Sequence, residues 1–337
     1  MPIKPEAVGI TSTIPVEVLV AAKVTPVDLN NRFIATPDPQ ALLDEAEREG
    51  IPRNTCAWVK GLYATIRRSN LTTVLGVVQG DCTHLQSMLE ALLPELSTFV
   101  PFAYPFDKNR YLLRFEIEKI MEIFGVQWDE VRAAKKRLDF IRALAHEVDR
   151  RTWQGNLISG RDNFEVLVNC SDFKGDPDGF QTELEEKLKT AQTPYPAKTL
   201  RLGLLGVPAI FSDLFEFLEE YGARVVFNEV PRQFAMPNYR ADVLDQYLAY
   251  TYPYSIYGRV ADIAEQARLR KLDGYIHYVQ SFCHHQIEDM TFKKQLALPM
   301  LTLEGDRPGP LDGRSRTRVE AFLEMLRQPG AKSARRK

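Results

Sequence analysis

Short apolar runs alternate with segments of helical spacing in the first hundred residues of the chain. The segment Val16–Ala22 has apolar residues at helical spacing and lies between two strand-like runs. Ser12 or Thr13 is expected to cap this helix, and Pro15 suits its first turn. A second unit has a helical pattern around Leu85–Leu92 between two more strands. The four predicted strands are Val8–Thr11, Pro26–Leu29, Thr72–Val78 and Ser97–Phe102.

A different pattern follows between residues 109 and 150. Two amphipathic helices, Tyr111–Phe124 and Trp128–Val148, are joined at Gly125 and are predicted to connect two lobes. From residue 200 the alternation of strands and helices begins again, which hints at a duplication of the first lobe. The predicted strands of this part are Arg201–Leu205, Ala223–Asn228, Gly274–Phe282 and Leu298–Leu303, and the predicted helices are Ile210–Tyr221 and Arg316–Leu326.

These patterns predict an α/β fold with two Rossmann-like, doubly wound lobes and a helical connector. The expected boundaries are residues 1–108 for the N-terminal lobe, 109–160 for the connector and 161–330 for the C-terminal lobe. The remaining residues, 331–337, are expected to form a basic tail.

The overall charge of the protein is close to neutral. Its 337 residues include 43 Lys and Arg against 45 Asp and Glu, for a net charge of −2. No global basic field therefore attracts nucleic acid or an anionic membrane. No apolar run approaches the roughly 20 residues of a membrane helix, and the first residues lack the apolar core of a secretory signal. A cytoplasmic location is expected.

The four cysteines, Cys56, Cys82, Cys170 and Cys283, are far apart in the sequence and are not expected to form disulfides in a reducing cytoplasm. Ligands of open α/β sheets gather at the carboxyl ends of the strands, so at least two of Cys56, Cys82 and Cys283 are expected to face one crevice. Converging thiolates suit zinc or an iron–sulfur cluster, although the spacing matches neither a zinc finger nor a ferredoxin. Three separate buried thiols are the alternative.

Several local segments, in order, span nearly the whole chain: Ile14–Ala22, Cys56, Gly80–Cys82, Arg201–Gly206, Glu219–Val226, Phe282–Cys283, Leu303–Asp306 and Thr317–Phe322. Together they resemble the D-component family of 2-hydroxyacyl-CoA dehydratases, which also contains the cluster subunits of benzoyl-CoA reductase. Lys23 departs from the family pattern, because the family usually has glycine after this Ala-Ala pair.

This resemblance implies a [4Fe–4S] cluster held by Cys56, Cys82 and Cys283, with one iron left open. It implies an oxygen-sensitive lyase, or a subunit of one, that removes the hydroxyl group of a 2-hydroxyacyl-CoA thioester through a ketyl radical under anaerobic conditions. The expected partners are an acyl-CoA substrate, an ATP-dependent activator protein that donates the electron, and a homologous second subunit or a second copy of the chain. The sequence contains no Gly-x₄-Gly-Lys-Ser/Thr loop, which agrees with ATP being bound elsewhere.

Glu17 and Ser12 are the candidate catalytic residues. By the resemblance, Glu17 stands at the family's early glutamate and would orient the substrate or move a proton. The alternative for Glu17 is a first-turn carboxylate that complements a helix dipole. Ser12 is interpreted either as a helix cap or as a group that hydrogen-bonds the substrate or the cluster.

Other side chains near these segments have two interpretations each. His84, His284 and His285 follow cysteines and are either a further ligand or proton donor, or only neighbours of the cluster. Arg318 either binds a carboxylate or a phosphate of coenzyme A or forms a surface salt bridge. Cys170 is expected to be a structural thiol.

Two other functions stay open on the sequence alone. The first is a reductase or electron-transfer subunit of the benzoyl-CoA reductase type, which shares the cluster but not the dehydration. The second is a non-catalytic α/β binding module without a metal, because fold alone does not decide function.

Overall fold

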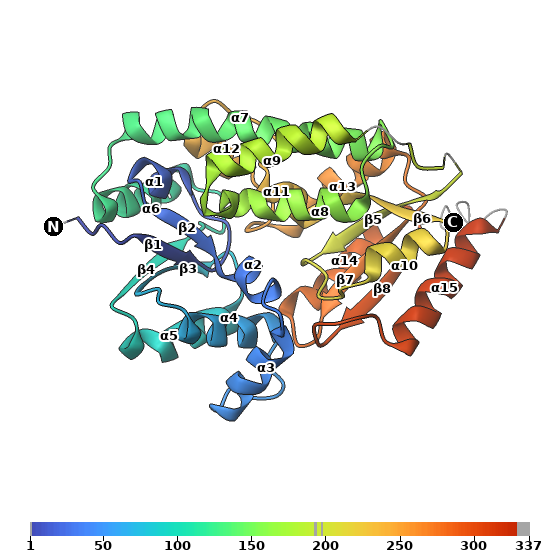
Figure 1. Ribbon diagram of the computed structural model, residues 1–337, viewed down its shortest axis with the longest axis horizontal. Coiled ribbons are helices and arrows are strands. Elements are labelled where there is room, and N and C mark those ends of the chain that lie inside the picture. The colour runs from blue at the N-terminus through green and yellow to red at the C-terminus, as the bar shows by residue number, and fades with distance from the viewer. Residues whose placement is uncertain (1, 192–193, 197, 329–337) are drawn as a thin grey trace.

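The computed structural model describes residues 2–191, 194–196 and 198–328, so the basic tail predicted for residues 331–337 lies outside the described residues. Two four-stranded sheets, both parallel throughout, organise this part of the chain, and helices flank them (Figure 1). The predicted α/β fold with two lobes is thereby confirmed. Among the described residues, no helix is long and apolar enough to cross a bilayer.

The first sheet contains β1 (Ala7–Ile10), β2 (Thr25–Asp28), β3 (Thr73–Gln79) and β4 (Thr98–Ala103), in the order β2-β1-β3-β4. All four strands coincide with predicted apolar runs to within a residue or two. The helices between and after them are α1 (Glu17–Ala21), α2 (Leu29–Ile34), α3 (Pro39–Arg48), α4 (Ala57–Arg68), α5 (Thr83–Leu92), the short η1 (Leu93–Glu95) and α6 (Arg110–Phe124).

The second sheet contains β5 (Leu200–Gly206), β6 (Ala223–Asn228), β7 (Gly274–Gln280) and β8 (Met300–Gly305), in the order β6-β5-β7-β8. Its helices are α10 (Leu214–Glu220), α11 (Glu229–Phe234), α12 (Val243–Ala249), α13 (Ile256–Arg270), the short η4 (His284–Ile287), α14 (Glu288–Gln295) and α15 (Gly313–Arg327).

The two lobes repeat one plan. Apart from the short η segments, each has the element order β-α-β-α-α-α-β-α-β-α, and in each the first strand lies between the second and the third. The chain passes from one lobe to the other through α7 (Trp128–Trp153), α8 (Gly160–Val168), η2 (Asn169–Ser171), η3 (Phe173–Gly175) and α9 (Pro177–Thr190). This repeated plan agrees with the duplication that the sequence hinted at.

The long helix α7 runs across the top of both sheets in Figure 1 and packs against α1, α8 and α9. The two helices predicted after residue 109 correspond to α6 and α7, and Gly125 ends α6 in the left-handed conformation (φ +72°) that favours glycine. The exact lobe boundaries stay predictions.

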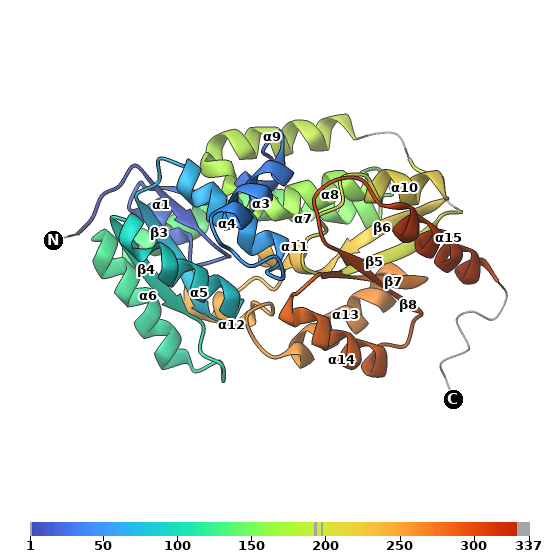
Figure 2. The same ribbon diagram turned by 90° about the horizontal axis from the view of Figure 1, so that it is seen from below.

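Each lobe sends helices into the hydrophobic core of the other lobe. Phe33, Leu42 and Ala64, from α2 to α4, pack into the core around β5, α10 and α15. In return, Val243 and Tyr247 of α12 pack into the core around β1 and β4. Figure 2 shows α4 and α11 in the middle of the molecule, between the two sheets. As a result of this exchange, the carboxyl ends of the two sheets face one shared cavity.

The helix predicted from Ile210 begins only at Leu214, so that prediction is partly wrong. Phe211 forms an isolated parallel bridge with Gly309, and the Ser212 N–H donates to the Gly309 carbonyl at 2.8 Å. These contacts keep the preceding residues extended, because their backbone groups are paired with a loop far along the chain.

The predicted cap of the first helix is also wrong. The helix α1 begins at Glu17 with Val16 at the N-cap position, and no side chain caps it. Ser12 and Thr13 lie too far ahead of α1 to bond its first N–H groups, and they line the space between the lobes instead.

Candidate metal centre

One cavity lies where the carboxyl ends of the two sheets meet, and both lobes contribute to its walls. It encloses about 1010 Å³, counting the part that is open to solvent. Cys56, Cys82 and Cys283 all line it. The strand pattern predicted at least two of these cysteines in one crevice, and the structure brings all three together. The apolar residues of the walls are Ile34, Trp58, Val59, Leu62, Leu85, Phe164, Val168, Val207, Pro208, Ala209 and Phe234.

Each of these cysteines occupies the N-cap position of a helix. Cys56 precedes α4, Cys82 precedes α5 and Cys283 precedes η4. Backbone N–H groups of the following turn favour the thiolate of each sulfur: those of Trp58 and Val59 act on Cys56, and equivalent groups act on the other two. None of these contacts has the full geometry of a capping hydrogen bond, yet the helix starts direct partial positive charge towards all three sulfurs.

A short sequence pattern repeats at two of the three thiols. Residues 78–84 read Val-Gln-Gly-Asp-Cys-Thr-His and residues 279–285 read Val-Gln-Ser-Phe-Cys-His-His. Both share the form Val-Gln-x-x-Cys-x-His, and in both the Gln is the last residue of the third strand of its lobe. Cys82 and Cys283 thus stand at equivalent points of the duplicated fold. This repeat is a signal that could have paired them from sequence.

The free thiols hold their protons at neutral pH. Burial raises the pKa of Cys56 to about 11, and the neighbouring Cys82 acts in the same direction. Burial and then Cys56 raise the pKa of Cys283 to about 12, and burial also raises the pKa of Cys82. The pKa of each thiol is thus also raised by a neighbouring acidic group: Cys82 acts on Cys56, Cys56 acts on Cys283, and the Asp81 carboxyl acts on Cys82. The three groups can therefore be thiolates together only beside a cation that offsets their negative charge.

Cys170 does not join the other three. It is buried in η2, its Sγ lies 3.4 Å from the Val166 carbonyl oxygen, and it is not among the residues that line the cavity. Its expected structural role agrees with this position. In the described part of the chain, no three His, Cys, Asp or Glu side chains are grouped closely enough to hold a single metal ion.

Beside Cys82 lies a carboxyl group that the sequence reasoning did not single out. Asp81 lines the cavity, accepts a hydrogen bond from the Tyr252 hydroxyl at 3.3 Å and is also contacted by Ser12. Burial raises its pKa, while His285 acts in the opposite direction. Ser12 is thereby placed on the cavity wall, as one of its two interpretations required.

Glu17 lies elsewhere. Its side chain is fully buried, with Oε1 2.7 Å from Arg142 of α7 and Oε2 2.7 Å from the Tyr247 hydroxyl of α12, and it does not line the cavity. Burial acts to raise its pKa, but Arg142 and Tyr247 outweigh this, so the pKa is lowered. Glu17 holds α1, α7 and α12 together, and this geometry gives its predicted catalytic role no support.

The three histidines differ in their surroundings. His284 and His285 line the cavity, with ring centroids 3.9 Å apart, whereas His84 does not line it and is exposed. Burial and the neighbouring His285 lower the pKa of His284 to about 4, so this ring is neutral at pH 7.

A family model for the D-component of 2-hydroxyglutaryl-CoA dehydratase matches residues 11–326. The chain belongs to this family. The resemblance found in the sequence is thereby confirmed, and membership in the D-component family supports a subunit of the 2-hydroxyacyl-CoA dehydratase type. A search of curated proteins found no match.

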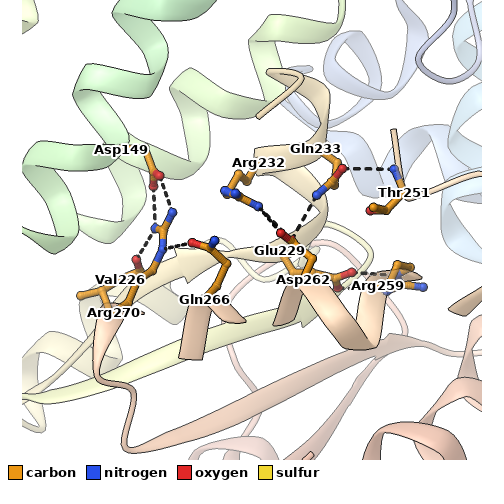
Figure 3. Close-up of polar contacts among 10 residues, drawn as sticks. All are labelled: Asp149, Val226, Glu229, Arg232, Gln233, Thr251, Arg259, Asp262, Gln266 and Arg270. Carbon is orange, nitrogen blue, oxygen red and sulfur yellow. Dashed lines mark hydrogen bonds and ion pairs between the residues drawn. The ribbon is translucent and has the colours of Figure 1, made fainter. Parts of the chain in front are cut away.

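In this D-component protein a seam of buried ion pairs supports the cavity from behind. Arg259, Asp262, Gln266 and Arg270 follow one another on one face of α13 (Figure 3). Arg270 donates to Asp149 of α7 at 2.5 and 2.8 Å, which ties the C-terminal lobe to the connecting helices. The other contacts of the seam are Arg232 with Asp262, Gln233 with Asp262, Gln233 with Thr251, Arg270 with Gln266 and Arg270 with the Val226 carbonyl.

Glu229 pairs with Arg259 in this seam. Its carboxylate accepts from Arg259 at 2.6 and 2.9 Å and from the Gly206 N–H at 2.9 Å, directly before the cavity residues Val207 to Ala209. Arg259 also donates to Glu288 at 2.5 Å, and Glu288 approaches Nδ1 of His285 to 2.9 Å. One buried guanidinium therefore fixes two segments of the cavity wall.

Proposed function

We propose that Cys56, Cys82 and Cys283 hold a [4Fe–4S] cluster with one open iron, and that the chain is a subunit of a 2-hydroxyacyl-CoA dehydratase. One observation carries this proposal: three thiols from separate segments line one cavity in a member of the D-component family. Such a cluster supplies a low-potential electron and an iron that is open to a substrate oxygen. That electron allows the loss of a hydroxyl group through a ketyl radical of the thioester.

The residues around the thiols suit such a group. Backbone N–H groups beside each sulfur favour its thiolate, and hydrogen bonds to cluster sulfurs are a main means by which a protein tunes a cluster. Apolar side chains such as Trp58, Leu62 and Phe164 restrict water at the site. Both features support a cluster rather than three unrelated thiols.

The polar groups of the cavity have separate tasks in this proposal. The hydroxyls of Ser12 and Tyr252 hold the Asp81 carboxyl beside Cys82. Ser12 also faces the cavity and is placed to donate to an oxygen of the bound thioester. The proposed partners are an acyl-CoA substrate, an ATP-dependent activator protein as electron donor, and a homologous second subunit or a second copy of the chain.

The test starts with anaerobic iron and sulfide analysis and electron spin resonance. We expect about four irons per chain in the natural protein and in a Cys170→Ser control, because Cys170 lies away from the cavity, and a clear loss of iron in Cys82→Ser. A colourless natural protein after anaerobic reconstitution would contradict the cluster.

The reaction is tested separately with an activator, ATP and an (R)-2-hydroxyacyl-CoA. Dehydration supports the proposal. Reduction of a thioester without loss of water would instead favour the reductase alternative.

A further inference from the structure

Two buried aspartates are in contact where the first sheet meets the connecting segment. Asp28 is the last residue of β2, and Asp172 lies between η2 and η3. The Asp28 N–H donates to Oδ2 of Asp172 at 2.7 Å, although the two residues are 144 positions apart in the chain. Only 4% of Asp28 and 6% of Asp172 is exposed. The fold therefore places two carboxyl groups together in a setting that is nearly closed to water.

Neither carboxyl has a cation as a partner. Among the residues that the structure describes, no Lys, Arg or His forms an ion pair with Asp28 or Asp172. Lys174 is close in sequence, but its ammonium pairs with Glu183 at 2.6 Å. The guanidinium of Arg142 on α7 is engaged by two other carboxylates. Burial and the lack of a cation both favour the neutral form of a carboxyl, so the pair retains a proton more readily than exposed carboxyls do.

The other titratable groups around the pair carry no charge at neutral pH. Burial raises the pKa of Cys170 to about 12, with Arg142 opposing and Asp172 adding to the effect. Burial also raises the pKa of the Tyr250 hydroxyl, and Asp28 acts in the same direction. The protonation of the pair therefore depends on the two carboxyls themselves and on the hydrogen-bond donors around them.

These donors stabilise the two carboxylates to different degrees. Oδ1 of Asp28 accepts from the N–H and the side-chain amide of Asn30 at 2.9 and 3.0 Å, and the Ser171 hydroxyl also acts on this carboxyl. Asp172 accepts from the backbone N–H groups of Asp28 and Lys174. Burial raises the pKa of Asp28 against these donors, whereas burial and then Asp28 raise the pKa of Asp172 to about 7. Asp172 thus gains and loses a proton close to neutral pH.

One member of the pair reaches the thiol cavity. Asp28 lines this cavity together with Thr11, Asn30 and Asn31, whereas Asp172 is not among the lining residues. No Lys or Arg of the described chain lines the cavity. Asp28 is therefore a carboxyl on the wall that can meet a bound molecule, and a second carboxyl stands behind it.

We propose that Asp28 and Asp172 share one exchangeable proton and form an acid–base pair of the thiol cavity, in which Asp28 meets the substrate. This inference rests on the proposed function. Loss of water from a 2-hydroxyacyl-CoA breaks the C–O bond at C2, whose electron pair leaves on oxygen, and the C–H bond at C3, whose electron pair stays on carbon. The pair gives its proton to the departing hydroxide and takes up the proton from C3, so it ends as it began.

Infrared difference spectroscopy of the full chain tests the shared proton, because a protonated carboxyl has a C=O band that shifts in deuterated water. We expect a band that titrates at about pH 7 in the natural protein and is lost in Asp172→Asn. Asp28→Asn should move the titration to lower pH, because a neighbouring negative charge is removed. Asn is also a favoured N-cap residue, so this change keeps the cap of α2. The control Asp129→Asn alters a side chain that is 92% exposed and should leave the band unchanged.

Dehydration kinetics of the iron-loaded protein test the acid–base role. We expect Asp28→Asn to lower kcat about 100-fold at unchanged iron content, within the usual contribution of general acid–base catalysis. Asp172→Asn should shift the pH profile of kcat to lower pH, because Asp28 then ionises without a charged neighbour, and Asp129→Asn should keep the natural profile.

Two results would overturn the pair. One is the absence of a titrating band that Asp172→Asn removes, and the other is an Asp28→Asn protein with the natural kcat and iron content. A natural protein that binds iron but does not dehydrate the thioester would overturn the acid–base role together with the proposed function. The infrared titration decides the shared proton without the reaction, so the two failures are distinguishable. Circular dichroism checks that each variant is folded, and Asp172→Asn tests the band even if Asp28→Asn does not fold.

Discussion

Replacing Arg259 with Met tests the buried seam beside the thiol cavity. The Arg259 side chain is 2% exposed and serves two carboxylates, Glu229 with 1% and Glu288 with 18% of its side chain exposed. Met replaces the apolar stem of Arg and carries no charge, so Arg259→Met leaves both carboxylates without this cation. Removing one partner of a buried ion pair costs about 3–5 kcal/mol of the free energy of unfolding.

The corresponding shift in melting temperature follows from the size of the protein. With about 2.1 cal/mol/K per residue over 337 residues, the entropy of unfolding is about 0.7 kcal/mol/K, so we expect Tm to fall by about 4–7 °C. Equilibrium denaturation in urea, followed by circular dichroism, gives the free-energy difference directly. The control Arg268→Met, on the same helix but exposed, is expected to change the free energy of unfolding by less than about 0.5 kcal/mol.

The same variant makes a prediction about pH. Burial acts to raise the pKa of Glu288, but Arg259 and His285 outweigh it and lower the pKa to about 2. Ionised Glu288 therefore stabilises the natural protein above its unfolded pKa, and this contribution is lost as the pH falls towards 2. Without Arg259 the pKa of Glu288 rises, so the stability gap between the two proteins should narrow on acidification. A gap below about 1 kcal/mol at pH 7, or one that widens in acid, would refute the reasoning.

Three further predictions concern single positions. Lys23 has a φ of +59°, a backbone conformation that favours glycine. Lys23→Gly relieves this strain but adds entropy to the unfolded chain, so urea denaturation should show a net rise of about 0.5–1 kcal/mol in the free energy of unfolding. A loss of stability would contradict this. Gly80 has a φ of +92° and an added Cβ would lie 2.9 Å from Cβ of Tyr104, so Gly80→Ala should displace the segment that leads to Cys82 and lower the iron content after reconstitution, which an unchanged iron content would contradict. Burial and then the neighbouring Asp28 raise the pKa of Asp172 to about 7. The natural protein should therefore lose stability as the pH rises from about 4 towards 8 and Asp172 ionises, and Asp172→Asn should lose less. Equal changes in the free energy of unfolding with pH for the two proteins would contradict this.

Local sequence patterns predicted much of the fold. Strands such as β3 and β7 are continuous apolar runs, as strands covered on both faces should be, and they were predicted within two residues of their ends. The helices α2, α3 and α4 were not predicted, and they fill the part of the chain between residues 29 and 68. Part of their apolar surface packs into the core of the opposite lobe, so the sequence alone does not show which face of each helix is buried.

The candidate site was likewise predicted from the sequence only in part. The family resemblance singled out Cys56, Cys82 and Cys283, and the repeated Val-Gln-x-x-Cys-x-His pattern stands in the sequence as a further signal. Glu17 shows what a family position cannot convey. Its partners, Arg142 and Tyr247, are 125 and 230 residues away in the chain, so only the folded structure shows that its carboxylate is buried and paired.

The sequence by itself determined the fold class and the strands, because hydrophobic periodicity depends on residues close together in the chain. Its resemblance to the family singled out the three thiols. Only the tertiary structure decided that the three thiols share one cavity and that Asp81 and Tyr252 line it with them. These features arise where helices from each lobe enter the core of the other. Burial and charge at such a place depend on contacts between residues far apart in the chain, and those contacts exist only once the lobes have packed together.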